Sequence, residues 1–217
     1  MSSIVDLIVL ASSAKNSERC VAGIDVRTGE WVRPVGSTGH GEVPFALRNI
    51  KGQEPEIFDI VRMELEKTGE THGFQMENRA IVKGPWERVG RASSSDVLPY
   101  CCNADFVFYD DDASVRHADL RDDVNRNSSL QLWEVHDFTS VEDHNFQGAK
   151  RWKGSFSIPS GQRYSMVIKD LDFEERLNQG HRYSHHCLLL LSLGAPFLSR
   201  FRSEPYCWKL IATVIEL

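Results

Sequence analysis

The stretch SSAKNSERCVAGIDVRTGEWVRPV, residues 12–35, carries the pattern on which the fold prediction rests. Residues 19–24 and 31–34 are typical of two short strands. The turn signal Arg27-Thr28-Gly29-Glu30 lies between them. Two such strands joined by a tight turn predict a β-hairpin. The small and polar residues 11–18 before the hairpin predict a loop.

Strand patterns continue on both sides of this hairpin. Residues 4–10 are apolar on both faces, which is typical of a central strand. Residues 60–66 alternate between apolar and charged side chains, the period of a half-solvated antiparallel strand. Further strands are expected over residues 80–83, 130–138, 151–158, 164–171, 185–192 and 208–215.

Two short helices are expected among these strands. Residues 93–96 carry a serine-rich cap for a helix that runs toward Cys101. A second helix is expected over residues 173–178, capped by Asp172 and ended by Gly180. The intervening acidic run, residues 110–112, is expected to be a solvated loop.

The strands form two groups of about five around a polar middle. Short, strongly turning strands in groups of five are typical of small barrels, which leave few sheet edges exposed. We therefore predict a mainly β chain with two consecutive small barrels and a few short helices. The expected boundaries are residues 1–90 for the first barrel, 91–128 for a connection and 129–217 for the second barrel. Periodicity alone also allows a single sandwich.

The composition limits the classes of function. The chain has 217 residues, of which 41% are hydrophobic and 26% charged, as in an ordinary globular protein. Its formal net charge of −6 argues against nonspecific binding of duplex DNA, which usually goes with a basic balance. Any interaction with nucleic acid must therefore rest on local basic patches.

The cysteines and the apolar runs indicate a reducing compartment. The five cysteines are an odd number and form no C-x-x-C pair. The apolar run at residues 4–11 is short and contains Asp6, unlike a signal peptide. We expect a cytoplasmic protein with free thiols and no membrane segment.

No motif in the sequence indicates catalysis or a cofactor. Cys20 lies inside a predicted strand with no evident base, so it is interpreted as a buried core thiol; an enzyme that depends on Cys20 is a minor alternative. His185 and His186 are expected on opposite strand faces without a partner pair, so no metal site is predicted. We expect no catalytic residue, no metal and no cofactor.

The candidate binding residues are cations interleaved with aromatic side chains, the ingredients of a single-strand binding groove. In the second half, Arg151 and Lys153 should share one strand face while Trp152 and Phe156 fill the barrel. In the first half, Trp31 and Arg33 point the same way and could hold a base between them, or could pack structurally. An ordinary solvated hairpin is the alternative for the second half. The complete set is Lys15, Arg19, Trp31, Arg33, Lys150, Arg151, Lys153, Arg163 and Tyr164.

Several segments together resemble the bacterial dual-OB domain family. They are RCVAG followed by WVRP in residues 19–34, FDIVRMEL at 58–65, QMENRAIV at 75–82, GQRYSMVIKD at 161–170, and LLLLSLGAPF with YCWKLIATVIEL in residues 188–217. The resemblance implies two OB-like barrels. It also implies a role in binding nucleic acid or a nucleotide within bacterial conflict systems.

From the residues and the resemblance together, we predict a non-catalytic binding module. Its expected ligand is single-stranded DNA or RNA, or a nucleotide. The alternative is a protein-interaction subunit that docks on a partner effector, encoded in the same operon, because the acidic balance suits a basic partner.

Overall fold

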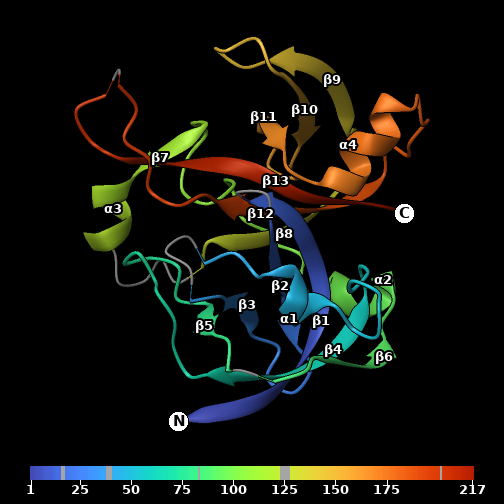
Figure 1. Cartoon of the computed structure of the whole chain (residues 1–217). Coiled ribbons are helices and arrows are strands. Elements are labelled where there is room, and N and C mark those ends of the chain that lie inside the picture. Colours follow the sequence, from blue (N-terminus) through green and yellow to red (C-terminus); the bar gives the residue numbers. More distant parts are fainter. Residues whose placement is uncertain (16–17, 38–40, 83, 123–127, 201) are drawn as a thin grey trace. The chain divides into compact units, whose positions relative to one another are not determined.

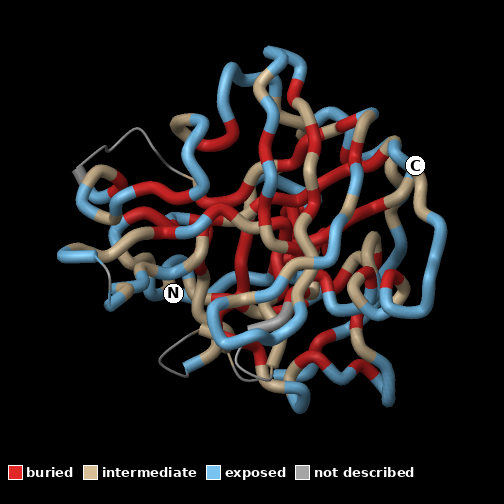
Figure 2. Tube along the Cα trace, turned by 90° about the horizontal axis from the view of Figure 1, so that it is seen from above, coloured by how far each residue is buried: buried red, intermediate tan, exposed pale blue. Residues whose placement is uncertain are grey.

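The computed structural model describes residues 1–15, 18–37, 41–82, 84–122, 128–200 and 202–217. The chain divides into two compact units, Met1–Pro99 and Tyr100–Leu217, called unit 1 and unit 2 below (Figure 1). Each unit contains one β-sheet and only short helices, so the predicted mainly β fold is confirmed. Buried stretches of the chain gather in the interior of the trace and exposed stretches lie mostly at its periphery (Figure 2). Within the described part of the chain, no helix has the length and apolar character needed to cross a membrane.

Unit 1 is a six-stranded sheet with two single-turn helices. Its strands follow the order β5-β3-β2-β1-β4-β6. Helix α1 lies between β3 and β4 in the chain, and α2 follows β6. The bounds are β1 Ser2–Lys15, β2 Glu18–Asp25, β3 Trp31–Val35, α1 Phe45–Arg48, β4 Asp59–Glu66, β5 Asn78–Ala80, β6 Glu87–Arg91, α2 Ser94–Val97 and the 3₁₀ turn η1 Leu98–Tyr100.

The long strand β1 lets the sheet of unit 1 curl back on itself. Its first half pairs with β4 and its second half with β2, and the register shifts between Val9 and Ala11. Strands β3 and β5 are parallel, and an isolated bridge from Leu65 to Ile81 joins β4 to the residue that follows β5. The pairings therefore run through β1-β2-β3-β5-β4 and back to β1. This cycle fits the five-stranded, partly open barrel of an OB fold.

The inner face of this sheet and part of its outer face are apolar. The inner face holds the core, with Val5, Leu7, Val9, Val21, Val32, Val61, Met63 and Leu65 among its members. Ile8 pairs with Ile24 and Ala11 with Ala22, so these four side chains lie on the outer face by alternation. Each of the four is at most 7% exposed. The outer face of β1 and β2 is therefore buried at these four positions as well.

Unit 2 is a seven-stranded sheet with one two-turn helix, α4, and a shorter one, α3. Its main path is β8-β12-β13-β11-β10-β9, and β7 pairs with β13. The bounds are β7 Ser114–Arg116, α3 His117–Asp122, β8 Leu130–Val135, β9 Thr139–His144, β10 Lys150–Ser157, β11 Arg163–Ile168, α4 Leu171–Asn178, β12 Cys187–Leu193 and β13 Tyr206–Glu216.

The two ends of this path, β8 and β9, are consecutive pieces of one broken strand. Three residues, 136–138, separate them, and Phe138 is completely buried at the break. β8 pairs with β12 as β1 pairs with β4, and β9 pairs with β10 as β1 pairs with β2. Strands β11 and β13 are parallel, as β3 and β5 are. Unit 2 thus repeats the cycle of unit 1.

The acidic run before β7 packs on unit 2 and is not simply solvated, which corrects the sequence expectation. The Lys209 side chain is completely buried, and its ammonium donates to the Asp110 carboxylate at 2.6 Å and to the Asp110 carbonyl at 2.7 Å. Burial lowers the pKa of Lys209, while the hydrogen bond that its ammonium donates to Asp110 opposes that effect. A buried cation needs such a partner. The carboxylate of Asp110 therefore has a structural role.

Several boundaries differ from the sequence prediction. Residues 11–15 belong to β1 and not to a loop, because their backbone pairs with β2. The strand expected over residues 130–138 ends at Val135, and β9 was not predicted. Asp170, and not Asp172, caps α4: its carboxylate accepts from the Phe173 and Val214 amides, each at 3.0 Å. That carboxylate joins the helix start to β13.

Candidate nucleic-acid interface

The strands β9, β10 and β11 present one polar outer face. Ser155 pairs with Thr139 on one side and with Ser165 on the other, and its hydroxyl donates to Ser165 Oγ at 3.2 Å. Alternation along the strands therefore fixes the members of the face. They are Thr139, Val141, Asp143, Arg151, Lys153, Ser155, Ser157, Arg163, Ser165 and Val167, none of which is buried. Three predicted cations, Arg151, Lys153 and Arg163, thus share this outer face.

Each of these cations has a carboxylate partner. Asp143 accepts from Arg151 at 2.7 Å and lies 3.1 Å from the Lys153 ammonium. Arg163 lies 3.6 Å from Asp137. The hydrogen bonds from Arg151 and Lys153 hold the pKa of Asp143 down at about 2, so the carboxylate is ionised at neutral pH. An anionic ligand must therefore compete with Asp143 for these two cations.

Lys150 and Trp152 lie on the other side of β10. The Lys150 ammonium is 5.1 Å from the Trp152 ring centroid and 2.8 Å from Glu142. Trp152 is half-buried, and its indole donates to Asn178 at the end of α4 at 3.0 Å. Phe156 fills the core as predicted. Trp152 does not, because its hydrogen bond to Asn178, the last residue of α4, holds it at the surface.

Tyr164 is an interior residue. Its ring stacks on Phe156 with centroids 5.9 Å apart, and only 4% of the residue is exposed. Its hydroxyl accepts from the Val107 amide at 3.0 Å and donates to the Asp110 carbonyl at 3.1 Å. The structure therefore places Tyr164 beneath the outer face, where it ties the 107–110 segment to β11.

A family model for the dual OB-containing domain matches residues 5–214, nearly the whole chain. The chain belongs to the dual OB-containing domain family. No curated protein matches it. The family assignment agrees with the two five-strand cycles, and it identifies the chain as a binding module of the OB type. OB folds bind oligonucleotides on the face of their second and third strands and on two loops beside it.

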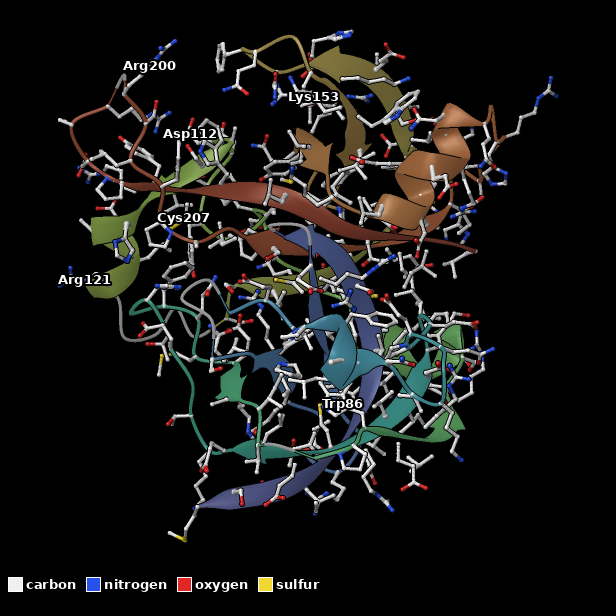
Figure 3. All side chains as sticks on the ribbon, in the orientation of Figure 1. Trp86, Asp112, Arg121, Lys153, Arg200 and Cys207 are labelled. Carbon is white, nitrogen blue, oxygen red and sulfur yellow. The ribbon has the colours of Figure 1, made fainter. Side chains whose placement is uncertain are left out.

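In unit 2 those two strands are β10 and β11, and the loops are residues 145–149 and 194–205. The first loop carries Phe146, which is 98% exposed. The second carries Phe197 and Leu198, 59% and 58% exposed, and Arg202, whose guanidinium stands 3.7 Å over the Tyr206 ring. Figure 3 shows Arg200 at the tip of this second loop and Lys153 on β10. The sequence analysis did not predict these loop residues as part of the site. The pattern that could have indicated them is an aromatic side chain in a connection bounded by glycine or proline.

The corresponding strands of unit 1 are different. Trp31 pairs with Ile24, so Trp31 and Arg33 do share the outer face, as predicted. Arg33 is only 7% exposed and lies 3.2 Å from the carboxylate of Glu77. Arg19 is held by Glu54 at 3.2 Å and by the Ser12 carbonyl at 2.9 Å. The Lys15 side chain lies outside the described residues.

The cysteines whose pKa is shifted are not activated nucleophiles. Burial raises the pKa of Cys187 and of Cys207 to about 12, and that of Cys101 to about 11. A thiol that stays protonated at neutral pH is a poor nucleophile. Cys20 is half-buried opposite Ser13 on the outer face of β2, and not in the core as expected.

The fold also joins two histidines and a carboxylate that the sequence did not bring together. His186 was expected to lack a partner, but its Nε2 lies 2.8 Å from Glu134 on the neighbouring strand. His136 stacks on His186. His185 instead bonds through Nδ1 to the Phe138 carbonyl at 2.6 Å. Glu134 and His186 are 52 residues apart in the sequence, so local spacing could not reveal the pair.

Proposed function

We propose that the chain is a non-catalytic module that binds single-stranded nucleic acid on the outer face of β9, β10 and β11. The observation that carries this proposal is the placement of Arg151, Lys153 and Arg163 on one exposed face. That face belongs to the strands with which OB folds bind oligonucleotides. Cations contact phosphates, and the exposed aromatics of the two loops supply stacking surfaces for bases.

The ion pairs on this face predict moderate and strongly salt-dependent affinity. A phosphate must displace Asp143 from Arg151 and Lys153, and the net charge of −6 repels polyanions elsewhere. Exposed ion pairs of this kind stabilise a protein by only about 0–1 kcal/mol, so exchange is feasible. The acidic remainder of the surface would favour short local contacts over a long nonspecific track.

Fluorescence polarisation with labelled single-stranded DNA and RNA oligonucleotides tests the proposal, with a labelled nucleotide as a further probe. We expect binding at low salt that weakens steeply as salt rises. An Arg151→Ala, Lys153→Ala, Arg163→Ala triple variant should reduce the slope of log affinity against log salt by about 2, because each single-strand phosphate contact contributes about 0.7.

The matched control is Arg62→Ala in unit 1. Arg62 is also an exposed arginine paired with an aspartate on the neighbouring strand, at 2.8 Å from Asp6. Its removal should leave oligonucleotide binding unchanged. Equal losses in the control and the triple variant would overturn the proposed location, and no binding at low salt would overturn the proposed ligand.

A protein ligand is the second candidate, favoured by the exposed apolar side chains of Phe146, Phe197 and Leu198. In this proposal the module acts in the cytoplasm of a bacterium, in a conflict system, and docks on an effector from the same operon. Co-purification from the native host tests it. A Phe197→Ser, Leu198→Ser variant should lose the partner, whereas retention of the partner would exclude this loop.

A further inference from the structure

Three metal-ligating side chains meet where the first strand of unit 2 is broken. Glu134 is near the end of β8, His136 lies in the break, and His186 immediately precedes β12. β8 and β12 are antiparallel neighbours, with Val135 opposite Cys187. The residue after Val135 therefore faces the residue before Cys187, which brings the two histidines together.

The geometry already resembles a chelating site. The rings of His136 and His186 stack with centroids 4.2 Å apart and an interplanar angle of 29°. His186 Nε2 lies 2.8 Å from Glu134 Oε1. One ligand atom from each of the three residues lies within 4.8 Å of the other two. His136 is exposed, and the Glu134 and His186 side chains are 37% and 41% exposed, so an ion can reach them from solvent.

We propose that Glu134, His136 and His186 form a binding site for a divalent transition-metal ion of the Zn²⁺ type. Two imidazoles and one carboxylate are a ligand set that Zn²⁺ accepts, with a water in the fourth position. Bonds of about 2.0–2.1 Å in a tetrahedral site place ligand atoms about 3.3 Å apart. Rotation of the exposed His136 side chain can supply the needed contraction.

Strand pairing makes the site more rigid than a chance surface cluster. The backbones around Glu134 and His186 are fixed by the β8–β12 ladder, and the His186 amide donates to Ser184 Oγ at 3.1 Å. A bound ion would link the break at residues 136–138 to the start of β12. The proposed role is therefore a clip that stabilises unit 2 at the point where its first strand is interrupted.

The other histidine–carboxylate pair of this unit provides a contrast. His181 Nε2 lies 3.1 Å from Glu216, but the Arg176 guanidinium also donates to that carboxylate and lies 3.3 Å from His181. A fixed cation in the pair repels a metal ion. His181 is therefore a matched control for His136 and His186.

Equilibrium dialysis of the full chain, stripped with EDTA and then exposed to ZnCl₂, tests the site. We expect one Zn²⁺ per chain and a higher melting temperature in its presence. His136→Ala and His186→Ala should each lose the equimolar binding and the thermal shift, whereas His181→Ala should keep both. Because His136 is exposed, the His136→Ala variant should fold. Its melting temperature without zinc should equal that of the wild type, which checks that the variant is folded.

The result that would overturn the site is a wild-type chain that binds no Zn²⁺ at equimolar concentration. Retained zinc binding in both His136→Ala and His186→Ala would do the same. The site uses none of the residues of the proposed nucleic-acid face. Oligonucleotide binding by His136→Ala therefore separates a failure of this inference from a failure of the proposed function.

Discussion

Units 1 and 2 share one strand cycle but differ in two respects. The first strand of unit 1 is continuous and bends at a register shift near Val9, whereas that of unit 2 is broken at residues 136–138. The outer face of β1 and β2 is apolar and at most 7% exposed at four positions, whereas that of β9 to β11 is polar and accessible. The same fold therefore provides a buried surface in one unit and a candidate ligand surface in the other.

The largest expected loss of stability comes from filling the space beside a glycine in β2 of unit 1 and in β10 of unit 2, the corresponding strands of the two cycles. A Cβ added at Gly23 in β2 would lie 1.8 Å from the backbone oxygen of Ile8, which cannot move away. A Cβ at Gly154 in β10 would meet side-chain atoms of Phe138 and Ile211 at 2.6 Å, which can shift. Gly23→Ala should cost more than about 3 kcal/mol and Gly154→Ala about 1–3 kcal/mol.

Urea unfolding followed by circular dichroism measures both changes. Gly52→Ala is not a suitable control because its φ of 91° strains any side chain, whereas Gly84 has open space around its Cβ position and no such angle. Gly84→Ala should be neutral within about 0.5 kcal/mol. A larger loss of unfolding free energy in Gly154→Ala than in Gly23→Ala would contradict this expectation.

The next effect concerns the buried cation of unit 2. Asp110→Ala leaves the completely buried Lys209 without its carboxylate, which should destabilise the chain by about 3–5 kcal/mol. The neighbouring Asp111 is exposed, so Asp111→Ala should change the free energy of unfolding by less than about 0.5 kcal/mol. Equal costs in a denaturation series would mean that the whole acidic run matters only through its net charge.

A smaller effect, of opposite sign, is expected on the proposed ligand face. Asp143→Asn removes the carboxylate that holds Arg151 and Lys153, which frees both for phosphate. Oligonucleotide affinity should rise about two- to fivefold, which corresponds to the free energy of an exposed ion pair. The control is Asp6→Asn, which frees Arg62 in unit 1 and should have no effect. A fall in affinity for Asp143→Asn would show that the pair positions the cations.

The sequence predicted most strands because their patterns are local. The alternation in β4 places Val61, Met63 and Leu65 in the core as expected. The loop predicted at residues 11–18 was wrong over residues 11–15, because small residues have weak strand preference and only pairing with β2 extends β1 to Lys15; residues 16–17 lie outside the described part of the chain. The strand predicted over residues 130–138 missed the break after Val135, because the apolar Phe138 beyond the polar His136 and Asp137 is buried like the apolar residues of β8.

The candidate site was predictable only in part. Alternation correctly placed Arg151 and Lys153 on one face. It gave no information on which carboxylate each would meet, because Asp143 comes from β9, which was not predicted. Nor could periodicity show that Arg33 is buried beside Glu77, since that contact joins segments more than 40 residues apart.

Hydrogen–deuterium exchange with and without a single-stranded oligonucleotide at low salt tests most directly whether the outer face of β9, β10 and β11 is the ligand surface. Protection on binding is expected in residues 139–168 and in the loop at 194–205, with residues 1–99 unchanged. Protection confined to residues 18–35 of unit 1 would contradict this expectation, because the buried outer face of that unit would then be the ligand surface.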